Sequence, residues 1–215
     1  MKTDLLYPLK VTLQTGHLGS LIVVSQNKDI MKIILFTLFL GLSLNAIANI
    51  ETRPDEGGWI NKDSTRAPNS DSMKSINGFG GWLVVTPDKD WAQKWETPTE
   101  NIPYFSEANE VKYGEELTIL PFFINPKADS AGEINIFCHI KITKPTGKAS
   151  IDQGNIPCAN SKLYGDPRNI RLTTTIIKYI GENNDPSGTW LVEFTIFDKN
   201  RNTSIPLKTQ FTLIK

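Results

Sequence analysis

The sequence is poor in the side chains that most enzymes and metal sites use. It contains two cysteines, Cys138 and Cys158, and two histidines, of which only His139 lies beyond residue 48. Two cysteines and His139 give three such ligands, too few for a structural zinc site, which takes four nitrogen or sulfur ligands. The patterns G-x-S-x-G and H-E-x-x-H and the phosphate-binding P-loop are absent as well. We therefore expect no enzyme activity, no catalytic residues, no cofactor and no metal.

An excess of charge of one sign is also missing. The 23 Lys and Arg residues balance the 23 Asp and Glu residues, so the formal net charge is zero at neutral pH. Surfaces that bind nucleic acid or anionic lipid are usually basic, because they must neutralise phosphate groups. We therefore expect no nucleic-acid partner.

No apolar run approaches the roughly 20 residues that a membrane-spanning helix needs. The run from Ile33 to Leu44 follows the basic residue Lys32 and precedes the small-x-small pattern at residues 46–48. This order is typical of a secretory signal peptide. We predict a signal peptide from Met31 to Ala48, cleavage before Asn49, and a periplasmic or secreted protein that does not span the membrane after cleavage. A buried helix or an N-terminal anchor is the alternative.

The segments on either side of the signal peptide show no regular pattern. Residues 1–30 are mixed in character, and we interpret them as a wrongly assigned start or a leader extension. Residues 49–78 are polar and contain prolines, glycines and scattered charges. We predict that they form a flexible linker, which leaves residues 79–215 as one domain.

Both cysteines lie in that domain. In an oxidising compartment an even number of cysteines favours a disulfide, so we predict a bond between Cys138 and Cys158. It would attach a long irregular loop around Cys158 to the strand that carries Cys138. A redox or nucleophilic thiol is the alternative, but it would need a C-x-x-C spacing or a neighbouring histidine.

The domain has the sequence pattern of β-strands. Residues 134–143 alternate between apolar and mostly polar side chains, which places Cys138 on a buried face and His139 on an outer face. Similar runs predict strands at 81–86, 117–125, 171–180, 189–197 and 205–214. Helical periodicity is almost absent. We therefore predict an all-β fold, an antiparallel sandwich of about seven strands with one short helix.

The C-terminal segment "GTWLVEFTIFDKNRNTSIPLKTQFTLIK" has a Gly-aromatic entry, an alternating strand, a D-x-N turn and a final alternating strand. It resembles the closing hairpin of bacterial secreted immunoglobulin-like (fibronectin III-like) domains, and "IKITKPTGK" resembles their strand-turn-strand passages. The resemblance extends over about residues 117–215. It implies an immunoglobulin-like sandwich but no particular activity.

The one predicted helix lies in "TPDKDWAQKWETP", residues 86–98. Thr86 can cap it, and Pro87 suits its first turn. Trp91 and Trp95 are four residues apart and so share a face of the helix. They either cover an open end of the sandwich or form an aromatic platform for a sugar ring or a protein. We expect at least one of them to be exposed beside a concave surface near residues 87–105, whereas Trp82 and Trp190 should belong to the core.

Two other groups of polar residues could suggest chemistry. Glu107, Glu110, Glu115 and Glu116 precede a strand, where paired carboxylates could act on glycosides. "DKNRN", residues 198–202, begins like a calcium loop but lacks the central glycine and the terminal glutamate. We interpret the first as a solvated loop and the second as a turn.

These observations favour a non-enzymatic binding domain that recognises a protein or a component of the cell envelope. The alternatives are a carbohydrate-binding module that uses Trp91 and Trp95 and, less favoured, a small hydrolase. The partner is therefore expected to be an unknown protein or an envelope glycan.

Overall fold

The computed structural model describes residues 57–61, 64–97 and 103–215. Residues 1–30, the predicted signal peptide and residues 49–56 of the predicted linker lie outside this part of the chain. The described residues form ten strands and one helix: β1 (Met73–Ile76), β2 (Phe79–Thr86), α1 (Trp91–Trp95), β3 (Glu110–Lys112), β4 (Glu116–Ile124), β5 (Glu133–Thr143), β6 (Ala149–Lys162), β7 (Arg171–Leu172), β8 (Ile177–Ile180), β9 (Gly188–Asp198) and β10 (Thr203–Ile214).

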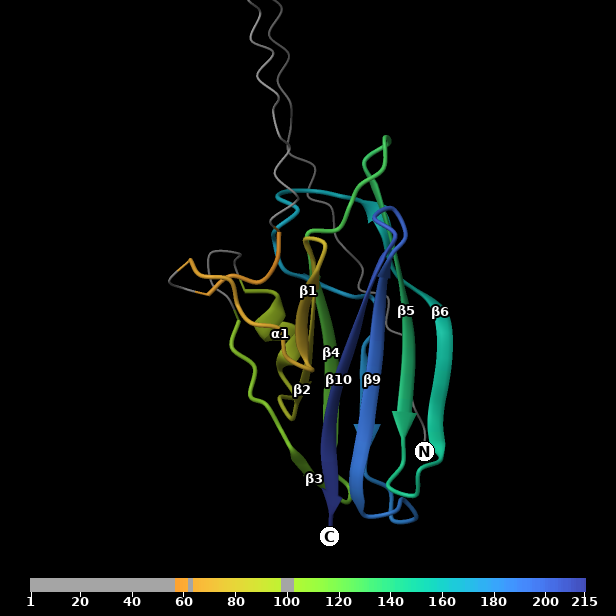
Figure 1. Ribbon diagram of the computed structural model, residues 1–215. Coiled ribbons are helices and arrows are strands. Elements are labelled where there is room, and N and C mark those ends of the chain that lie inside the picture. The colour runs from red at the N-terminus through yellow and green to blue at the C-terminus, as the bar shows by residue number, and fades with distance from the viewer. Residues whose placement is uncertain (1–56, 62–63, 98–102) are drawn as a thin grey trace, which may run out of the picture. The chain divides into compact units, whose positions relative to one another are not determined.

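The strands form two sheets that face each other in a sandwich (Figure 1). The first sheet has the order β1-β2-β4, and β7 and β8 pair with different parts of the remaining edge of β4. The second sheet has the order β3-β10-β9-β5-β6. The paired strands are antiparallel except for β3, which runs parallel to the end of β10. The predicted fold class, an all-β immunoglobulin-like sandwich with one short helix, is confirmed.

The described chain has more strands than the seven expected. β6 occupies residues that we interpreted as an irregular loop, and the predicted strand 171–180 is divided into β7 and β8. β6 shows no clear alternation because it is an edge strand with mostly exposed side chains. Three register shifts against β5 interrupt its pattern further. An edge strand of this kind lacks the hydrophobic period by which strands are identified in a sequence.

The main core lies between the two sheets. In β5 every second residue from Ile134 to Ile142 is buried, and β9 alternates in the same way around Trp190 and Phe194. The sheets come close at Gly81, where a Cβ atom would lie 3.1 Å from Cγ2 of Ile205. A side chain at this position of β2 would therefore push β10 away.

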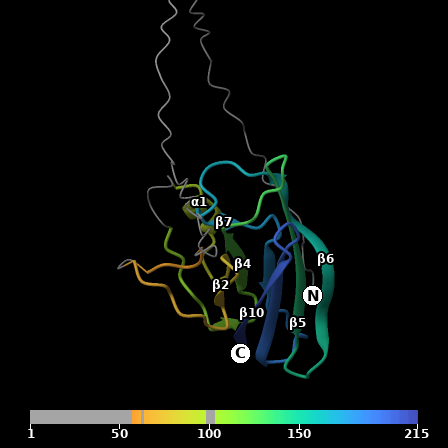
Figure 2. The same ribbon diagram turned by 45° about the horizontal axis from the view of Figure 1, so that its top comes forward.

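The first sheet is buried on both faces. Every residue of β4 from Leu117 to Ile124 is buried. Leu117, Ile119 and Phe123 belong to the core between the sheets, whereas Leu120 and Phe122 belong to a second cluster on the outer face, which is the face away from the second sheet. Helix α1 lies on this outer side (Figure 2). The apolar side chains on the outer face of this sheet must therefore be covered by other parts of the chain. A sandwich whose outer faces are polar and solvated does not need such cover.

The prediction of a flexible linker at residues 49–78 is wrong for the part that the structure describes, residues 57–61 and 64–78. Trp59 is buried, and its indole N–H lies 3.1 Å from the carbonyl oxygen of Gly81. Residues 73–76 form β1, which pairs with β2. The side chain of Asn69 bonds both the N–H and the C=O of Ser75 on the outer edge of β1. The polar composition of this segment gives no indication that it packs on the domain, because few apolar side chains hold it there.

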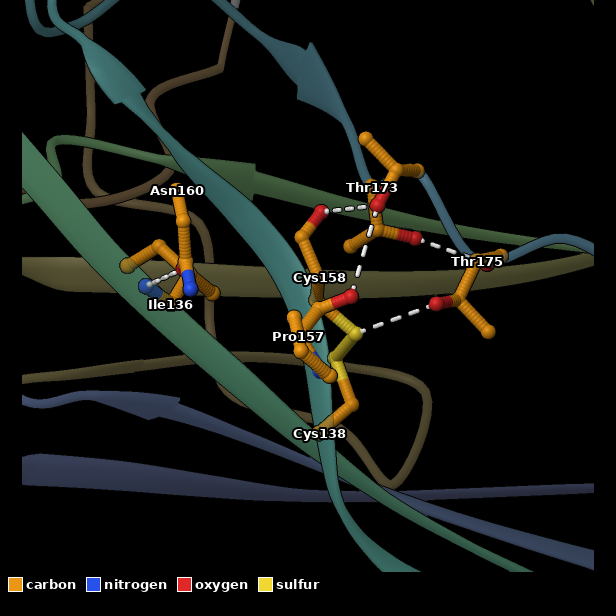
Figure 3. Close-up of a disulfide and its surroundings, with 8 residues drawn as sticks. Ile136, Cys138, Pro157, Cys158, Asn160, Thr173 and Thr175 are labelled. Atoms are coloured by element: carbon orange, nitrogen blue, oxygen red, sulfur yellow. Dashed lines mark hydrogen bonds between the residues drawn. A yellow bond between two sulfur atoms is a disulfide. The ribbon is translucent and has the colours of Figure 1, made fainter. Parts of the chain in front are cut away.

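The predicted disulfide between Cys138 and Cys158 is present, with both residues fully buried (Figure 3). It joins two neighbouring strands of one sheet, β5 and β6, so the expectation that it holds a loop is wrong. The Thr174 N–H donates to the carbonyl oxygen of Cys158 at 2.7 Å. The hydroxyl of Thr175 lies 3.5 Å from Sγ of Cys158. The connection between β7 and β8 thus covers the outer edge of β6 at the bridge.

Candidate functional site

Helix α1 is shorter than predicted, and it places Trp91 and Trp95 at its two ends. Thr86 does not cap it, because Thr86 ends β2 opposite Thr118 and its hydroxyl accepts from the Asp88 N–H at 3.1 Å. Both tryptophans are half-buried and pack on the outer face of the first sheet. They are thus neither fully buried nor prominently exposed.

A polar contact holds the helix to the neighbouring chain. Oδ2 of Asp88 accepts from Nζ of Lys94 at 2.7 Å and from the Ser106 N–H at 2.9 Å. Burial raises the pKa of Asp88, but the hydrogen bonds from Lys94 and Ser106 outweigh it, so this pKa lies below its ordinary value of 3.8. The hydrogen bond to Asp88 raises the pKa of Lys94 above 10.5. One carboxylate thus joins both ends of α1 to the segment that carries Phe105.

Five aromatic residues form what we call the outer aromatic cluster: Trp82, Trp91, Trp95, Phe105 and Phe122. The ring of Phe122 lies at its centre. Its centroid is 5.3 Å from those of Trp82 and Trp95 and 5.7 Å from that of Phe105. Such separations are typical of favourable aromatic pairs. The rings therefore support one another on the outer face of β2 and β4.

Trp82 was expected in the core, but it is half-buried on the outer face. The assignment of Trp190 is correct, since it is fully buried between the sheets. The signal for Trp82 lies in β2, where apolar residues follow one another without alternation. Such a run indicates that both faces are covered, and Trp82 then falls on the face opposite Leu83.

The indole N–H groups fall into two classes. Those of Trp59 and Trp190 donate to backbone carbonyl oxygens, as buried indoles usually do. Those of Trp82, Trp91 and Trp95 have no acceptor among the residues that the structure describes. The outer aromatic cluster therefore carries three indole N–H groups with no acceptor in the described part of the chain, on rings that are partly exposed.

An open cleft of about 680 Å³ lies between the segment that follows β2 and residues of β3, β4 and β8. Its lining residues are Pro87, Lys89, Glu110, Val111, Gly114, Glu115, Glu116, Leu117, Lys178 and Ile180. The concave surface expected near residues 87–105 thus includes only Pro87 and Lys89 of that range. Trp91 and Trp95 do not line it. The structure therefore separates the tryptophan pair from this cleft.

The cleft contains three of the glutamates considered above, Glu110, Glu115 and Glu116. Glu116 forms an ion pair with Lys178 at 2.9 Å, and the carboxylate of Glu115 accepts from the Lys112 N–H at 3.0 Å. His139 lies far along the second sheet, on the outer face as predicted, where it pairs with Asp152 at 2.7 Å. No group of three or more potential metal ligands occurs in the described part of the chain.

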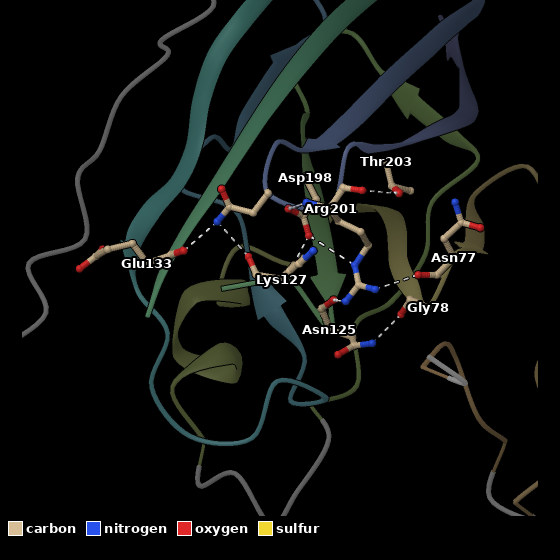
Figure 4. A network of polar contacts seen from close by, with 9 residues as sticks. Asn77, Gly78, Asn125, Lys127, Glu133, Asp198, Arg201 and Thr203 are labelled. Atoms are coloured by element: carbon tan, nitrogen blue, oxygen red, sulfur yellow. Dashed lines mark hydrogen bonds and ion pairs between the residues drawn. The ribbon is translucent and has the colours of Figure 1, made fainter. Parts of the chain in front are cut away.

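The "DKNRN" segment forms the turn between β9 and β10, as interpreted (Figure 4). Asp198 is buried and accepts from the N–H groups of Lys127 and Arg201. The guanidinium of Arg201 donates to the carbonyl oxygens of Asn77 and Asn125. The network therefore ties three connections of the sandwich together: β1 to β2, β4 to β5, and β9 to β10.

Comparisons with known proteins yield only distant structural likenesses. No protein-family model and no curated protein matches the chain. The structure is similar to the PKD domain of an M14-like peptidase from a Thermoplasmatales archaeon, with 16% identity, a TM-score of 0.31, and coverage of 50% of this chain and 88% of that one.

It is also similar to a family 123 glycoside hydrolase from Clostridium perfringens, with 10% identity and a TM-score of 0.35. The match covers 63% of this chain but 27% of the hydrolase. Neither likeness carries an inference about activity or ligand. No helix in the described ranges has the length and apolar character needed to cross a membrane.

Proposed function

We propose that the chain is an exported, non-enzymatic binding domain that recognises a protein or a cell-envelope component through Trp91 and Trp95. The predicted signal peptide lies outside the described residues. The buried disulfide between Cys138 and Cys158 supports export from the cytoplasm, because such bonds persist in oxidising compartments. The periplasm or the exterior of the cell is therefore the proposed place of action.

One observation carries the assignment of the binding site. Trp91 and Trp95 combine partly exposed rings with N–H donors that have no acceptor among the described residues. Tryptophan is the residue most typical of binding hot spots, because its large ring gives contact area at little entropic cost. The rings are also held in place, since Trp95 packs against Phe122. A prepositioned pair of this kind suits recognition of a ligand.

The experiment compares the exported chain with the double variant Trp91→Ala/Trp95→Ala in capture of solubilised envelope fractions under mild crosslinking. We expect the double variant to lose capture while its circular dichroism spectrum stays unchanged. Phe197→Ala is the control, because Phe197 is an exposed aromatic residue on the second sheet. Capture that survives in the double variant would exclude this site.

The catalytic alternative has its own test. Incubation with generic ester and glycoside substrates should give no turnover above the buffer rate. Turnover that is lost in a Glu110→Gln or Glu115→Gln variant would instead identify the cleft as an active site and overturn the non-enzymatic assignment.

A further inference from the structure

We infer that the outer aromatic cluster binds a neutral glycan and that Trp82 is a third contact residue beside Trp91 and Trp95. The inference rests on the proposed function, and it adds the chemical class of the ligand and a residue. It is carried by the geometry of the rings, by the indole N–H groups that have no acceptor among the described residues, and by the ion pairs of Lys94.

The geometry packs two indoles against one buried ring, that of Phe122. Trp82 is the cross-strand partner of Phe122, and their planes are tilted by 31°. Trp95 approaches Phe122 from α1 with its plane tilted by 50°. Trp59 packs edge-on against Trp82, with a centroid distance of 6.0 Å, and supports it from the far side. The indoles are thus fixed before a ligand arrives, which reduces the entropic cost of binding.

The chemistry of the free groups matches a sugar. An indole offers a π face and a single N–H donor, and it offers no acceptor. Pyranose rings present C–H groups that can lie on an aromatic face, and their hydroxyl and ring oxygens can accept hydrogen bonds. The three indoles, whose N–H groups have no acceptor in the described part of the chain, therefore complement a ligand that combines apolar ring faces with acceptor oxygens.

The engagement of the one cation within α1 favours a neutral ligand. Lys94 is engaged by Asp88 at 2.7 Å and by Asp90 at 3.4 Å. A charged peptide would have to compete with these contacts. A neutral sugar would leave them intact.

The available area also favours a sugar over a protein surface. A protein interface of ordinary size buries about 800 Å² on each partner. An aromatic side chain has roughly 150–250 Å² to bury, and Trp82, Trp91 and Trp95 are each already half-buried. Their combined exposed area, at most a few hundred Å², suits a few stacked sugar rings.

The test uses the exported chain with two probes: a printed array of neutral oligosaccharides, and envelope fractions treated with either periodate or proteinase K. Periodate cleaves vicinal diols of sugars and leaves most peptide bonds intact. We expect capture to survive proteinase K and to be lost after periodate. We also expect the affinity for an array-selected oligosaccharide to fall at least about tenfold in Trp82→Phe and in Trp95→Phe.

Phenylalanine keeps most of the packing of these sites and removes the N–H donor, so the variants should stay folded, which thermal melting checks. Phe197→Ala should bind like the unchanged protein. Capture that is lost after proteinase K but survives periodate would overturn the glycan assignment and leave the proposed function standing. Oligosaccharide binding that is unchanged in Trp82→Phe would overturn the role of Trp82. A chain that captures neither probe would overturn both proposals.

Discussion

The two sheets of the sandwich bury their side chains in different ways. β4 in the first sheet is buried continuously from Leu117 to Ile124, whereas β5 in the second sheet alternates between buried and half-buried residues. The outer face of the first sheet is covered by α1, by Trp59 and by Phe105. The outer face of the second sheet carries partly exposed side chains such as His139 and Lys141.

This difference arises because segments outside the two sheets pack on the outer face of the first sheet only. Continuous apolar strands are best known from parallel sheets that are covered on both faces. Here they occur in an antiparallel sheet because aromatic side chains from outside the sheet cover it. The covering is incomplete at Trp82, Trp91 and Trp95, and the proposed binding site lies where it is incomplete.

Replacement of core phenylalanines is expected to give the largest effects. Phe122 and Phe123 point to opposite faces of the first sheet, and both are fully buried. We expect Phe122→Ala and Phe123→Ala each to lower the free energy of unfolding by about 3–5 kcal/mol. In the second sheet, Phe194→Ala should cost a similar amount.

The matched control for these variants is Phe197→Ala, because Phe197 lies on the outer face of the second sheet and is 37% exposed. It should cost less than about 1 kcal/mol, the size of a cross-strand pair. Urea unfolding followed by circular dichroism measures all four variants. If Phe122→Ala costs as little as Phe197→Ala, the contrast between the sheets is wrong.

Loss of the disulfide should have an intermediate effect that begins at one edge of the second sheet. The bridge closes a loop with a sequence separation of 20, so the chain-entropy relation gives about 3 kcal/mol for Cys138→Ala/Cys158→Ala. Hydrogen exchange should increase first in β6, which is an edge strand. Reductant should lower the melting temperature of the unchanged protein but not that of the variant. Equal melting of the unchanged protein with and without reductant would contradict this expectation.

The smallest effect is expected at the contact that holds α1 on the first sheet. Because the pKa of Asp88 is lowered in the folded protein, its stabilising effect is present above the ordinary value of 3.8 and is lost as the pH falls through the folded value. The indoles of Trp91 and Trp95 should then become more exposed. We expect a red shift of tryptophan emission in acid before the far-ultraviolet circular dichroism changes.

Asp88→Asn is the control for this titration, because an amide does not lose a charge in acid. It should show the shifted emission already at neutral pH and no separate acid step. An acid step of the same size in the variant would assign the change to other carboxylates.

The alternation of apolar and polar residues in β5, β9 and β10 predicts both the strands and their buried faces, because one face of each strand is buried and the other is not. β4 and β2 were recognised as strands, but their apolar residues on both faces do not say what covers the second face. β6 was missed because an exposed edge strand has no hydrophobic face to repeat. Trp59 was assigned to a linker because a single aromatic residue among polar ones gives no periodic signal.

The fold class, the cysteine pair, and the burial of Cys138 and Trp190 could be predicted from the amino-acid sequence. These follow from local alternation and from the number of cysteines, which depend on no distant contact. Two features depend on the tertiary structure: Trp82 joins Trp91 and Trp95 on the outer face of the first sheet, and the N–H groups of these indoles have no acceptor among the described residues. A hydrogen-bond partner or a covering ring can come from anywhere in the chain, so its presence is a property of packing in three dimensions.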